Sequence, residues 1–304
     1  MSEPSWALAR KRQKLTERAQ IFQEIRNFFI NRGYLEVETP HRIPANAPEP
    51  HIDVVASGPW ALHTSPELAM KRLLAAGYEQ LFQICRVWRD SERGQYHLPE
   101  FTLLEWYRTE VDYHALMTEC MELFYVLVPG GKLSRQGRII DMTMPWHQLT
   151  VADAFSQHAS MSLDAALAAD CFEEVLTAEV EPHLGKDQPV FLTEYPVSLA
   201  ALARTKPGEP QVAERFELYI DGLELANAFS ELTDPHEQRC RFEADETSRR
   251  DAGKTPYPLP EKFLEEMATM PEAAGIALGL DRLVMLLSDA ETINDVVAFT
   301  PDEI

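Results

Sequence analysis

The clearest pattern of hydrophobic and polar positions lies in residues 81–108. Two apolar segments rich in aromatic and β-branched residues, 81–88 and 101–107, flank a polar connection. This pattern predicts two antiparallel strands joined by a long loop. Because strand side chains alternate between faces, Glu105 and Tyr107 share one face with apolar neighbours. A buried carboxylate requires a partner, so the hairpin is a candidate binding element, and an ordinary salt-bridged hairpin is the alternative.

The pattern of apolar residues in the N-terminal part of the chain predicts a helix followed by a strand. Residues 16–32 carry apolar side chains at helical spacing, with Thr16 as a plausible N-cap and Gly33 as the stop. Residues 34–40 alternate apolar and charged positions and predict a strand. Residues 41–59 contain four prolines and predict a loop.

The next segment predicts a short strand and a second helix. The strand is expected over 60–63, and Ser65 as N-cap with Pro66 at the first helical position indicates a helix that ends at Gly77. Glu67 in the first turn either complements the helix dipole or faces a ligand, and the pattern leaves both open.

The middle of the chain is expected to be largely helical over 112–127 and 151–180. The glycine-rich link 129–137 lies between these segments, and its basic residues are expected to be solvated. Residues 190–193 predict a strand, and 206–211 predict a flexible loop.

An Asp-Gly pair at 221–222 lies between two β-like runs and is typical of a hairpin with a two-residue type I′ turn. The register of such a turn pairs Ile220 with Leu223, Tyr219 with Glu224 and Glu217 with Ala226. Glu217 and Glu224 then share a face as diagonal neighbours roughly 7 Å apart. They could share a magnesium ion on a nucleotide, with a solvated outer face as the alternative. Glu231 has the opposite parity to Glu224, so a bulge or kink must separate them if both face one cavity.

Residues 273–285 pass from a small-residue strand into an apolar helix. Free N–H groups at the helix start, together with Arg282 in the first turn, predict an anion site.

Composition and charge narrow the class of protein. The chain has 304 residues, 45% hydrophobic and 25% charged, which allows one large domain or two smaller ones. Its net charge of −21 would repel a polyanion except at a local basic patch, which disfavours tRNA as the main partner.

The cysteines and the apolar runs point to a reduced, cytoplasmic protein. The four cysteines are far apart and show neither zinc-ligand nor disulfide spacing. No apolar run approaches the ~20 residues of a membrane span, so no membrane association is expected. The basic first 15 residues lack the apolar core of a signal peptide.

Three segments, in this order, resemble the signature motifs of class II aminoacyl-tRNA synthetases. They are RGYLEVETP at 32–40, the hairpin at 81–108 with Arg89, His97 and Phe101, and the segment near 275–285 that begins GIALGLDR. Residues 64–74, 97–107 and 223–232 are most similar to lysyl-tRNA synthetase. Only 31 residues precede the first motif, too few for the anticodon-binding OB-fold barrel. The chain therefore resembles the truncated paralogues that ligate lysine, preferably (R)-β-lysine, to a lysine of translation elongation factor P.

The resemblance implies an α+β fold with a mostly antiparallel sheet flanked by helices. It implies a single catalytic domain over 1–304, without the OB-fold and with a helical insertion at about 150–187. It also implies a homodimer with the 32–40 motif at the two-fold interface.

The resemblance also implies a site for ATP with Mg²⁺. Arg89 would hold the α-phosphate and the substrate carboxylate, and His97 the outer phosphates. Phe101 would stack on adenine, and Arg282 would contact its other face and the γ-phosphate. Arg89 and Arg282 are the expected catalytic residues, and Glu217 and Glu224 the expected magnesium ligands. The expected ATP-binding residues are Arg89, Asp90, Ser91, His97, Phe101, Glu224, Leu225, Gly279 and Arg282.

The amino-acid site implied by the resemblance is acidic. Ser65 and Glu67 would contact the α- or β-amino group of a lysine-type substrate. The side-chain ammonium would be held by Glu105, Tyr107 and Glu231, because a desolvated ammonium requires acidic partners. The substrate carboxylate would attack the α-phosphorus to form an acyl-adenylate, which an acceptor amine then attacks.

Three positions depart from the family pattern. Ser91 replaces a glutamate that reads adenine, so this task falls to Glu92 or a backbone carbonyl. Leu98 replaces an asparagine and removes a polar nucleotide contact. Ala277 replaces the central glycine of the third motif and reshapes the floor of the amino-acid pocket.

Three functions stay open on the sequence. The first is an ATP-dependent ligase that charges lysine or (R)-β-lysine onto elongation factor P, favoured by the missing anticodon domain and Ala277. The second is a free-standing enzyme that acts on tRNA or another small acceptor. The third is a catalytically silent paralogue that binds an amino acid or adenylate as a regulatory subunit.

Overall fold

The computed structural model describes residues 6–304, with side chains from residue 8 onward. Residues 1–5, the start of the basic segment that lacks a signal-peptide core, lie outside the described residues. The chain forms two compact units. Unit 1 comprises Met1–Tyr107, Asp234–Pro271 and Leu278–Ile304, and unit 2 comprises Arg108–Thr233 and Glu272–Ala277. Each unit therefore joins segments that are far apart in the sequence.

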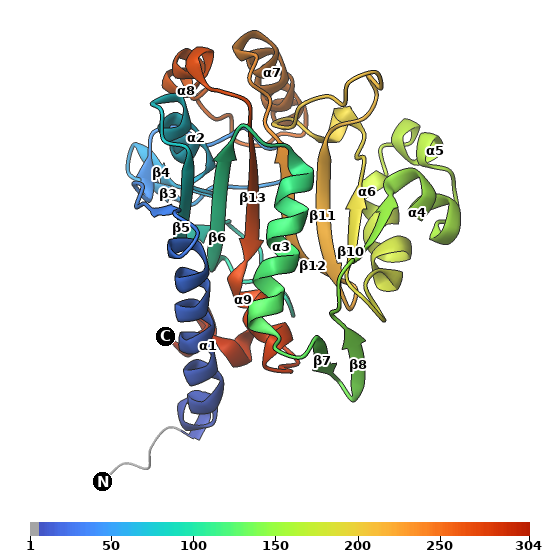
Figure 1. The fold of residues 1–304 in the computed structure, drawn as a ribbon. Coiled ribbons are helices and arrows are strands. Elements are labelled where there is room, and N and C mark those ends of the chain that lie inside the picture. The colour runs from blue at the N-terminus through green and yellow to red at the C-terminus, as the bar shows by residue number, and fades with distance from the viewer. Residues whose placement is uncertain (1–5) are drawn as a thin grey trace. The chain divides into compact units, whose positions relative to one another are not determined.

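Unit 1 combines a few strands with five α-helices in its described part (Figure 1). The helices are α1 (Trp6–Ile30), α2 (Glu67–Ala75), α7 (Pro235–Asp251), α8 (Glu261–Glu266) and α9 (Leu280–Leu287). Strands β1 (Leu35–Glu36), β5 (Gln80–Trp88) and β6 (Glu100–Thr109, its last two residues in unit 2) are hydrogen-bonded neighbours in that order. A second, small sheet has the order β2 (Arg42–Ile43), β4 (Trp60–Leu62) and β3 (Ala56–Ser57). Short 3₁₀ turns η4 (Met267–Thr269), η5 (Ile293–Val296) and η6 (Pro301–Glu303) complete the unit.

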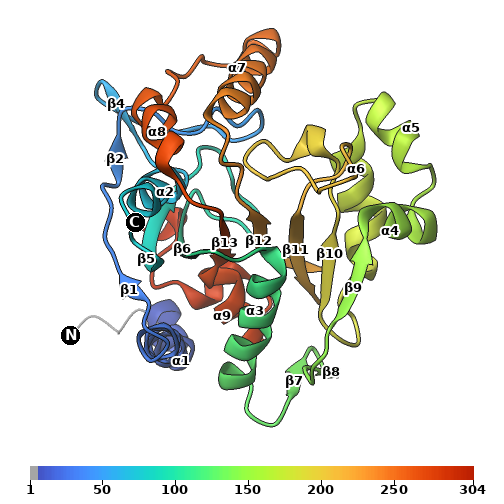
Figure 2. The same ribbon diagram turned by 45° about the horizontal axis from the view of Figure 1, so that its top comes forward.

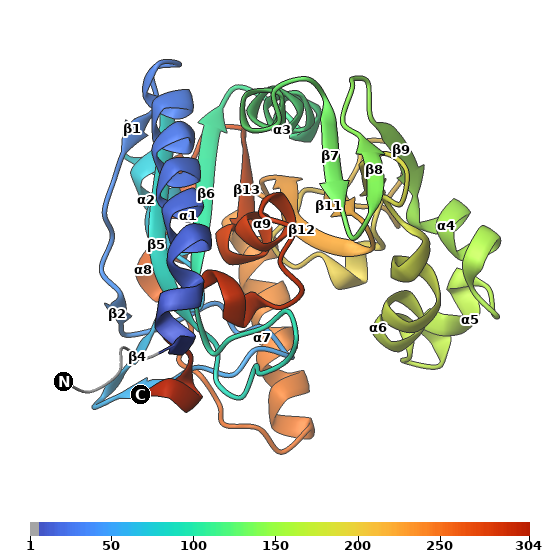
Figure 3. The ribbon, with the colours of Figure 1, turned by 90° about the horizontal axis from the view of Figure 1, so that it is seen from below.

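The core of unit 1 is aromatic. Phe29 of α1 stacks on Phe82 of β5 with ring centroids 5.0 Å apart, and it also contacts Trp106 at 5.1 Å. Helix α1 packs against η5 and α9, as the view from below shows (Figure 3). The N-terminal helix is thereby fixed to the C-terminal part of the unit.

Helix α1 starts ten residues earlier than the hydrophobic pattern predicted. Thr16 is inside the helix and donates its hydroxyl to the carbonyl oxygen of Arg12 at 2.8 Å, so the predicted N-cap is wrong. The extra turns are rich in Lys, Arg and Gln, which have good helix propensity but give no apolar periodicity. The predicted stop is confirmed, because Gly33 has a φ of +83° and donates to Ile30 at 3.1 Å.

The strand predictions for unit 1 differ in accuracy. The two strands predicted within 81–108 are confirmed as β5 and β6. The strand predicted over 34–40 is only the two residues of β1, and its Leu35 is 49% exposed. The predicted loop 41–59 contains β2 and β3, which are too short to leave a periodic pattern.

Unit 2 contains most of the remaining strands. Its large sheet has the order β13 (Ala273–Gly279, its last two residues in unit 1), β12 (Leu223–Ser230), β11 (Arg215–Ile220), β10 (Val190–Thr193) and β9 (His147–Thr150). The β10–β11 and β11–β12 pairs are antiparallel, and β9–β10 is parallel. Strands β7 (Lys132–Arg135) and β8 (Arg138–Asp141) form a separate hairpin.

A compact helical group packs beside β9 and β10 of unit 2 (Figure 2). The α-helices of unit 2 are α3 (Tyr113–Leu127), α4 (Val151–His158), α5 (Leu163–Ala168) and α6 (Phe172–Val175). The unit also has the π-helix η1 (Leu176–Val180) and the 3₁₀ turns η2 (Glu181–His183) and η3 (Val197–Leu199). Helix α3 lies apart from the helical group (Figure 2). Phe155 and Phe172 stack at 5.2 Å in the core of the group. The helices predicted at 112–127 and 151–180 are therefore confirmed.

The prediction for the link 129–137 is only partly correct, because Lys132 is exposed as expected and Arg135 is not. The segment contributes to the β7–β8 hairpin, and Arg135 is buried rather than solvated. Its guanidinium lies 3.6 Å from the carboxylate of Asp221, which comes from a distant part of the sequence. A local charge pattern could not reveal that partner.

The predicted α+β class is confirmed, because both units combine strands with flanking helices. The strand pairing is mixed, since β1–β5 and β9–β10 are parallel. Within residues 6–304, no helix is both long enough and apolar enough to cross a membrane.

Candidate functional site

The connection between β5 and β6 places a cation over an aromatic ring. Arg89 follows β5, and its backbone N–H donates to the carbonyl oxygen of Pro99 at 2.9 Å. Its guanidinium carbon lies 5.1 Å from the ring centroid of Phe101, and Nη1 lies 3.9 Å from a carboxylate oxygen of Glu92. The buried Nε of Arg89 has no hydrogen-bond partner among the described residues. A buried donor without a partner fits an anionic ligand.

Two of the three positions that depart from the family pattern, Ser91 and Leu98, lie in the connection between β5 and β6. Ser91 has a φ of +63° and donates its N–H to the carboxylate of Asp90 at 2.9 Å. Glu92, the next residue, lies against Arg89. Leu98 is only 3% exposed, so it packs in the interior of the loop instead of presenting a polar group.

Arg282 and His97 meet within unit 1. Arg282 lies in the first turn of α9, after the N-cap Gly279. Its Nη2 lies 2.5 Å from Nε2 of His97, and its Nε donates to the carbonyl oxygen of Tyr96 at 3.3 Å. Two predicted phosphate-binding side chains, far apart in the sequence, are thus adjacent.

A hydrogen-bonded network surrounds the carboxylate of Glu105. Glu105 is fully buried on β6; Ser65 donates its hydroxyl to Oε1 and Tyr107 donates its hydroxyl to Oε2, each at 2.7 Å. The Ser65 hydroxyl also accepts the N–H of Glu67 at 2.9 Å, although the N-cap of α2 is Pro66 and the helix begins one residue later than predicted. Ser65, Glu67, Glu105 and Tyr107 are therefore brought together.

The same network contains a buried lysine that the sequence analysis missed. Lys71 is 1% exposed and donates to the carboxylate of Glu67 at 2.6 Å. It lies one helical turn after Glu67, on the buried side of α2 with Met70 and Leu74. A lysine among apolar positions of an amphipathic helix was the available signal.

Burial, and to a smaller extent the negative charge of Glu67, raise the pKa of the Glu105 carboxyl to about 7. The hydroxyls of Ser65 and Tyr107 and the charge of Lys71 act in the opposite direction. Glu105 is therefore close to half ionised at neutral pH and will respond to a cation placed nearby.

A second missed residue, Arg249 of α7, organises the loop before β3. Its guanidinium is fully buried and donates to the carbonyl oxygens of Glu49 and Ile52 at 2.8 Å and to the carboxylate of Asp53 at 2.7 Å. The carbonyl oxygen of Asp53 in turn accepts the N–H of Asp90 at 2.7 Å. Arg249 thus holds this loop next to the residue that follows Arg89.

The partly buried Glu49 adds a further acid to this part of unit 1. Burial raises the pKa of its carboxyl to about 7, while the positive charge of Arg89 lowers it. Of the neighbouring carboxylates, Glu67 has the largest effect and raises this pKa. The side chain of Glu49 therefore lies within the electrostatic reach of two predicted site residues.

Glu217 in unit 2 is surrounded by donors. Tyr195 and Tyr219 donate their hydroxyls to one carboxylate oxygen at 2.5 and 2.7 Å, and Arg215 donates to the other at 2.6 Å. Burial raises the pKa of Glu217, and the charge of Glu224 raises it further. Glu224 therefore acts electrostatically on Glu217 within unit 2.

A β-bulge changes the register of this hairpin. The type I′ turn is confirmed by the positive φ values of Asp221 and Gly222, 58° and 74°. Near the turn Tyr219 pairs with Glu224 as predicted, but Glu217 pairs with Asn227 instead of Ala226. Leu225 is the extra residue, so its buried side chain lies between two paired residues of β12.

The bulge reverses the parity of the rest of β12. Asn227 shares the face of Glu224, and alternation gives Glu231 the same parity. The condition set by the sequence, a bulge between Glu224 and Glu231, is therefore met. Glu231 is 1% exposed, and Ala277 on β13 is partly buried.

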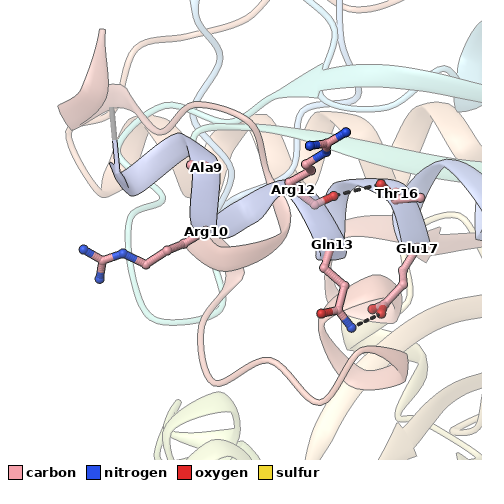
Figure 4. A pocket seen from close by; sticks show the side chains of 6 residues that line it. All are labelled: Ala9, Arg10, Arg12, Gln13, Thr16 and Glu17. Carbon is pink, nitrogen blue, oxygen red and sulfur yellow. Dashed lines mark hydrogen bonds between the residues drawn. The ribbon is translucent and has the colours of Figure 1, made fainter. Parts of the chain in front are cut away.

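A hollow on the surface of α1 contains none of the predicted site residues (Figure 4). It is lined by Ala9, Arg10, Arg12, Gln13, Thr16 and Glu17. Its polar contacts are local, including a 2.9 Å hydrogen bond from Gln13 to Glu17. Within residues 6–304, no group of three or more His, Cys, Asp or Glu side chains could hold a metal ion by itself.

Comparison with known proteins identifies the family. Residues 6–303 match the family described as tRNA synthetases class II (D, K and N). The chain belongs to this family. Membership implies the use of ATP, which agrees with the cationic and aromatic groups around Arg89.

The family relatives include enzymes with a defined acceptor. The chain is 41% identical to the elongation factor P–(R)-beta-lysine ligases of Klebsiella pneumoniae and Salmonella arizonae, over 99% of this chain and 99% of each relative. The corresponding protein of Salmonella dublin has the same identity and coverage. The predicted resemblance to this group of class II synthetase-like proteins is therefore confirmed.

Proposed function

We propose that this chain is an ATP-dependent ligase that activates lysine or (R)-β-lysine as an acyl-adenylate and transfers it to a lysine side chain of translation elongation factor P. The full-length similarity to relatives of that name supports the proposal. The observation that carries it is the buried carboxylate of Glu105, held by Ser65 and Tyr107 beside Glu67. Buried carboxylates of this kind fit a substrate ammonium group.

The nucleotide is proposed to bind around Arg89. Its unpaired Nε and the cationic Arg282 would neutralise phosphate charge, and His97 would contact the outer phosphates. Phe101 supplies an aromatic face for adenine. The remaining proposed contacts are Asp90, Ser91, Glu224, Leu225 and Gly279. Phosphoryl chemistry of this kind depends on positioning and charge neutralisation, so no general base is needed.

The residues of unit 2 fit a magnesium ion carried by the nucleotide. Burial and, second to it, the charge of Glu224 raise the pKa of Glu217, and a divalent cation beside the two carboxylates would stabilise their ionised forms. Magnesium prefers one or two protein carboxylates together with phosphate oxygens. When bound, it would neutralise phosphate charge; Tyr195, Tyr219 and Arg215 orient the Glu217 carboxylate for this role.

The amino acid is proposed to be held through its ammonium groups. Ser65 and Glu67 would contact the α- or β-amino group, and Glu105 with Tyr107 the side-chain ammonium. Glu231 is proposed to assist there, and Ala277 to shape the pocket floor. The substrate carboxylate would then attack the α-phosphorus next to Arg89, and pyrophosphate would leave.

The wider organisation follows the family. We propose a single catalytic domain over 1–304 with a helical insertion at about 150–187, where α4 to η2 follow one another. A homodimer through the 32–40 motif is supported by the exposure of Ile30 and Leu35, 54% and 49%. A cytoplasmic location without membrane contact fits a partner in translation.

The test is amino-acid-dependent ATP–pyrophosphate exchange with α-lysine, (R)-β-lysine, aspartate and no amino acid. Exchange with a lysine isomer but not with aspartate would support activation. Elongation factor P should then gain the mass of one lysyl group, and its variant with the acceptor lysine replaced by arginine should not. Charging of tRNA in its place would favour the tRNA enzyme, and no exchange from a folded protein that binds ATP would favour the silent paralogue.

A further inference from the structure

The buried ammonium of Lys71 lies beside the carboxylates that are proposed to bind the substrate. Lys71 and Glu67 are one turn apart on α2, with Nζ 2.6 Å from Oε1 and exposures of 1% and 14% for the two side chains. An exposed pair of this spacing contributes little, but a buried lysine is costly unless it has a compensating role.

The positive charge of Lys71 also acts on a second carboxylate, that of Glu105. Its charge lowers the pKa of Glu105, whereas Glu67 raises it. The other groups that act on Glu105 are the hydroxyls of Ser65 and Tyr107. The charge of Glu105 also acts on the buried thiol of Cys85 on β5. Burial together with this charge raises the pKa of Cys85 to about 12, so the thiol stays neutral.

The charges of this cluster can be counted. With Glu67 and Glu105 both ionised, Lys71 leaves one net negative charge, which one substrate ammonium would neutralise. Without Lys71, the two carboxylates would carry two negative charges in a buried setting, and Glu105 would retain a proton. That proton would have to leave before an ammonium group could form an ion pair with Glu105.

We propose that Lys71 is a positioning and specificity-determining residue that neutralises Glu67, so that Glu105 is left as the ionised partner of the side-chain ammonium group of the substrate. The inference rests on the proposed function for the identity of that substrate. The effect of Lys71 on Glu105 is independent of the proposed function, because it is a property of the protein without ligand.

The first test is a carbon-13 NMR titration of glutamate carboxyl groups in the ligand-free protein, with Glu105→Gln used to assign the signal. In Lys71→Met, which preserves much of the side-chain volume, the Glu105 midpoint should rise by about one pH unit. In Glu67→Gln it should fall, and Lys71→Arg should keep it near the wild-type value. Arg72→Met on the same helix, which loses an exposed pair with Glu266, should leave the midpoint unchanged.

The second test is the KM for lysine in pyrophosphate exchange. Near neutral pH, Lys71→Met should raise the KM for lysine by about fivefold, because the ionised fraction of Glu105 falls from about one half to about one tenth, with the KM for ATP unchanged. The difference should shrink as the pH rises past the midpoint of the variant, because Glu105 is then ionised in both proteins. A purely structural defect would not disappear with pH.

The outcomes separate the two proposals. An unchanged or lower Glu105 midpoint in folded Lys71→Met would overturn the role of Lys71, even in an active enzyme. If Lys71→Met does not fold, Lys71→Arg and Glu67→Gln still decide: an unchanged Glu105 midpoint in Lys71→Arg together with a fall in Glu67→Gln supports the inference, and no change in either variant contradicts it. Absence of exchange in the wild-type protein would reject the proposed function, while the NMR result would still stand.

Discussion

Nη2 of Arg282 lies 2.5 Å from Nε2 of His97, although the two residues are 185 positions apart in the sequence. Because the guanidinium can only donate, a hydrogen bond between these two atoms requires Nε2 of the histidine to accept. Together the pair forms a donor-rich surface at the start of α9.

The first prediction concerns this pair and ATP. His97→Ala and Arg282→Ala should each raise the KM for ATP by about tenfold or more, because each removes a contact to the phosphates or its orienting partner. Pyrophosphate exchange at saturating lysine measures the effect. The double variant should lose less than the product of the two single effects, since the residues touch.

His114→Ala is the matched control, because this exposed histidine lies outside the proposed site. It should leave the KM for ATP unchanged. Normal ATP affinity in both site variants would contradict the proposed nucleotide contacts.

The second prediction concerns Arg249. Arg249→Met should lower the free energy of unfolding by about 3 kcal/mol or more, because the carbonyls of Glu49 and Ile52 and the carboxylate of Asp53 lose a buried donor. Urea unfolding followed by circular dichroism measures this. Exchange activity should also fall in the folded fraction, since the loop holds Asp90 next to Arg89.

Arg250→Met provides the comparison on the same helix. Arg250 is largely exposed and pairs with Glu246 at 2.7 Å. Its loss should change stability by less than about 1 kcal/mol. Equal effects of the two substitutions would show that the buried contacts of Arg249 do not hold the loop.

The third prediction concerns pH and His63. Its ring is 1% exposed, with Nε2 2.7 Å from the carbonyl oxygen of Arg86, and burial lowers its pKa from 6.5 to about 4. The unfolded chain therefore binds a proton that the folded protein does not bind between these values. Stability should fall as the pH drops from 6.5 towards 4, by up to about 3 kcal/mol from this group.

Replacement by glutamine tests this contribution. His63→Gln retains an amide donor for the Arg86 carbonyl but cannot titrate, so its stability should depend less steeply on pH in that range. Denaturant midpoints at several pH values give the slope. An identical slope in wild type and variant would mean that other groups dominate acid destabilisation.

The fourth prediction concerns the donors around Glu217. Tyr195→Phe should raise the magnesium concentration needed for half-maximal exchange by about tenfold, because the Glu217 carboxylate loses an orienting hydroxyl. Glu224→Gln should have a larger effect because it removes a proposed ligand. Tyr125→Phe, at an exposed position of α3, should behave like wild type; a magnesium requirement unchanged in all three would argue against metal binding by these carboxylates.

Local sequence signals were sufficient for many elements. The Asp221–Gly222 turn was predictable because only a few residue pairs adopt two successive positive φ values without strain. The stop at Gly33 and the hydrogen bond from the Glu67 N–H to the Ser65 hydroxyl at the start of α2 are equally local. The motif residues Arg89, His97 and Arg282 could be located because they belong to segments whose order and spacing are specific to one family.

Other features depended on distant parts of the chain. The sequence indicated the bulge at Leu225 only indirectly, because without it Glu224 and Glu231 would point to opposite faces of the strand. Its position could not be predicted, since the register of a strand is set by all of its partners. The early start of α1 was hidden because its first turns have helix propensity but no apolar stripe, and their contacts come from residues such as Glu303.

The burial of charged residues was decided entirely by tertiary packing. Arg135 and Arg249 are indistinguishable from surface residues in a linear pattern, Lys71 differs only by its position among the apolar residues of α2, and all three are buried. Their partners Glu67, Asp221 and Asp53 supply the compensating charge, and two of these three lie far away in the sequence. Sequence could therefore place the candidate chemistry on elements, while the electrostatic environment of that chemistry, which sets the pKa of Glu105 and the fit of an ammonium group, required the folded chain.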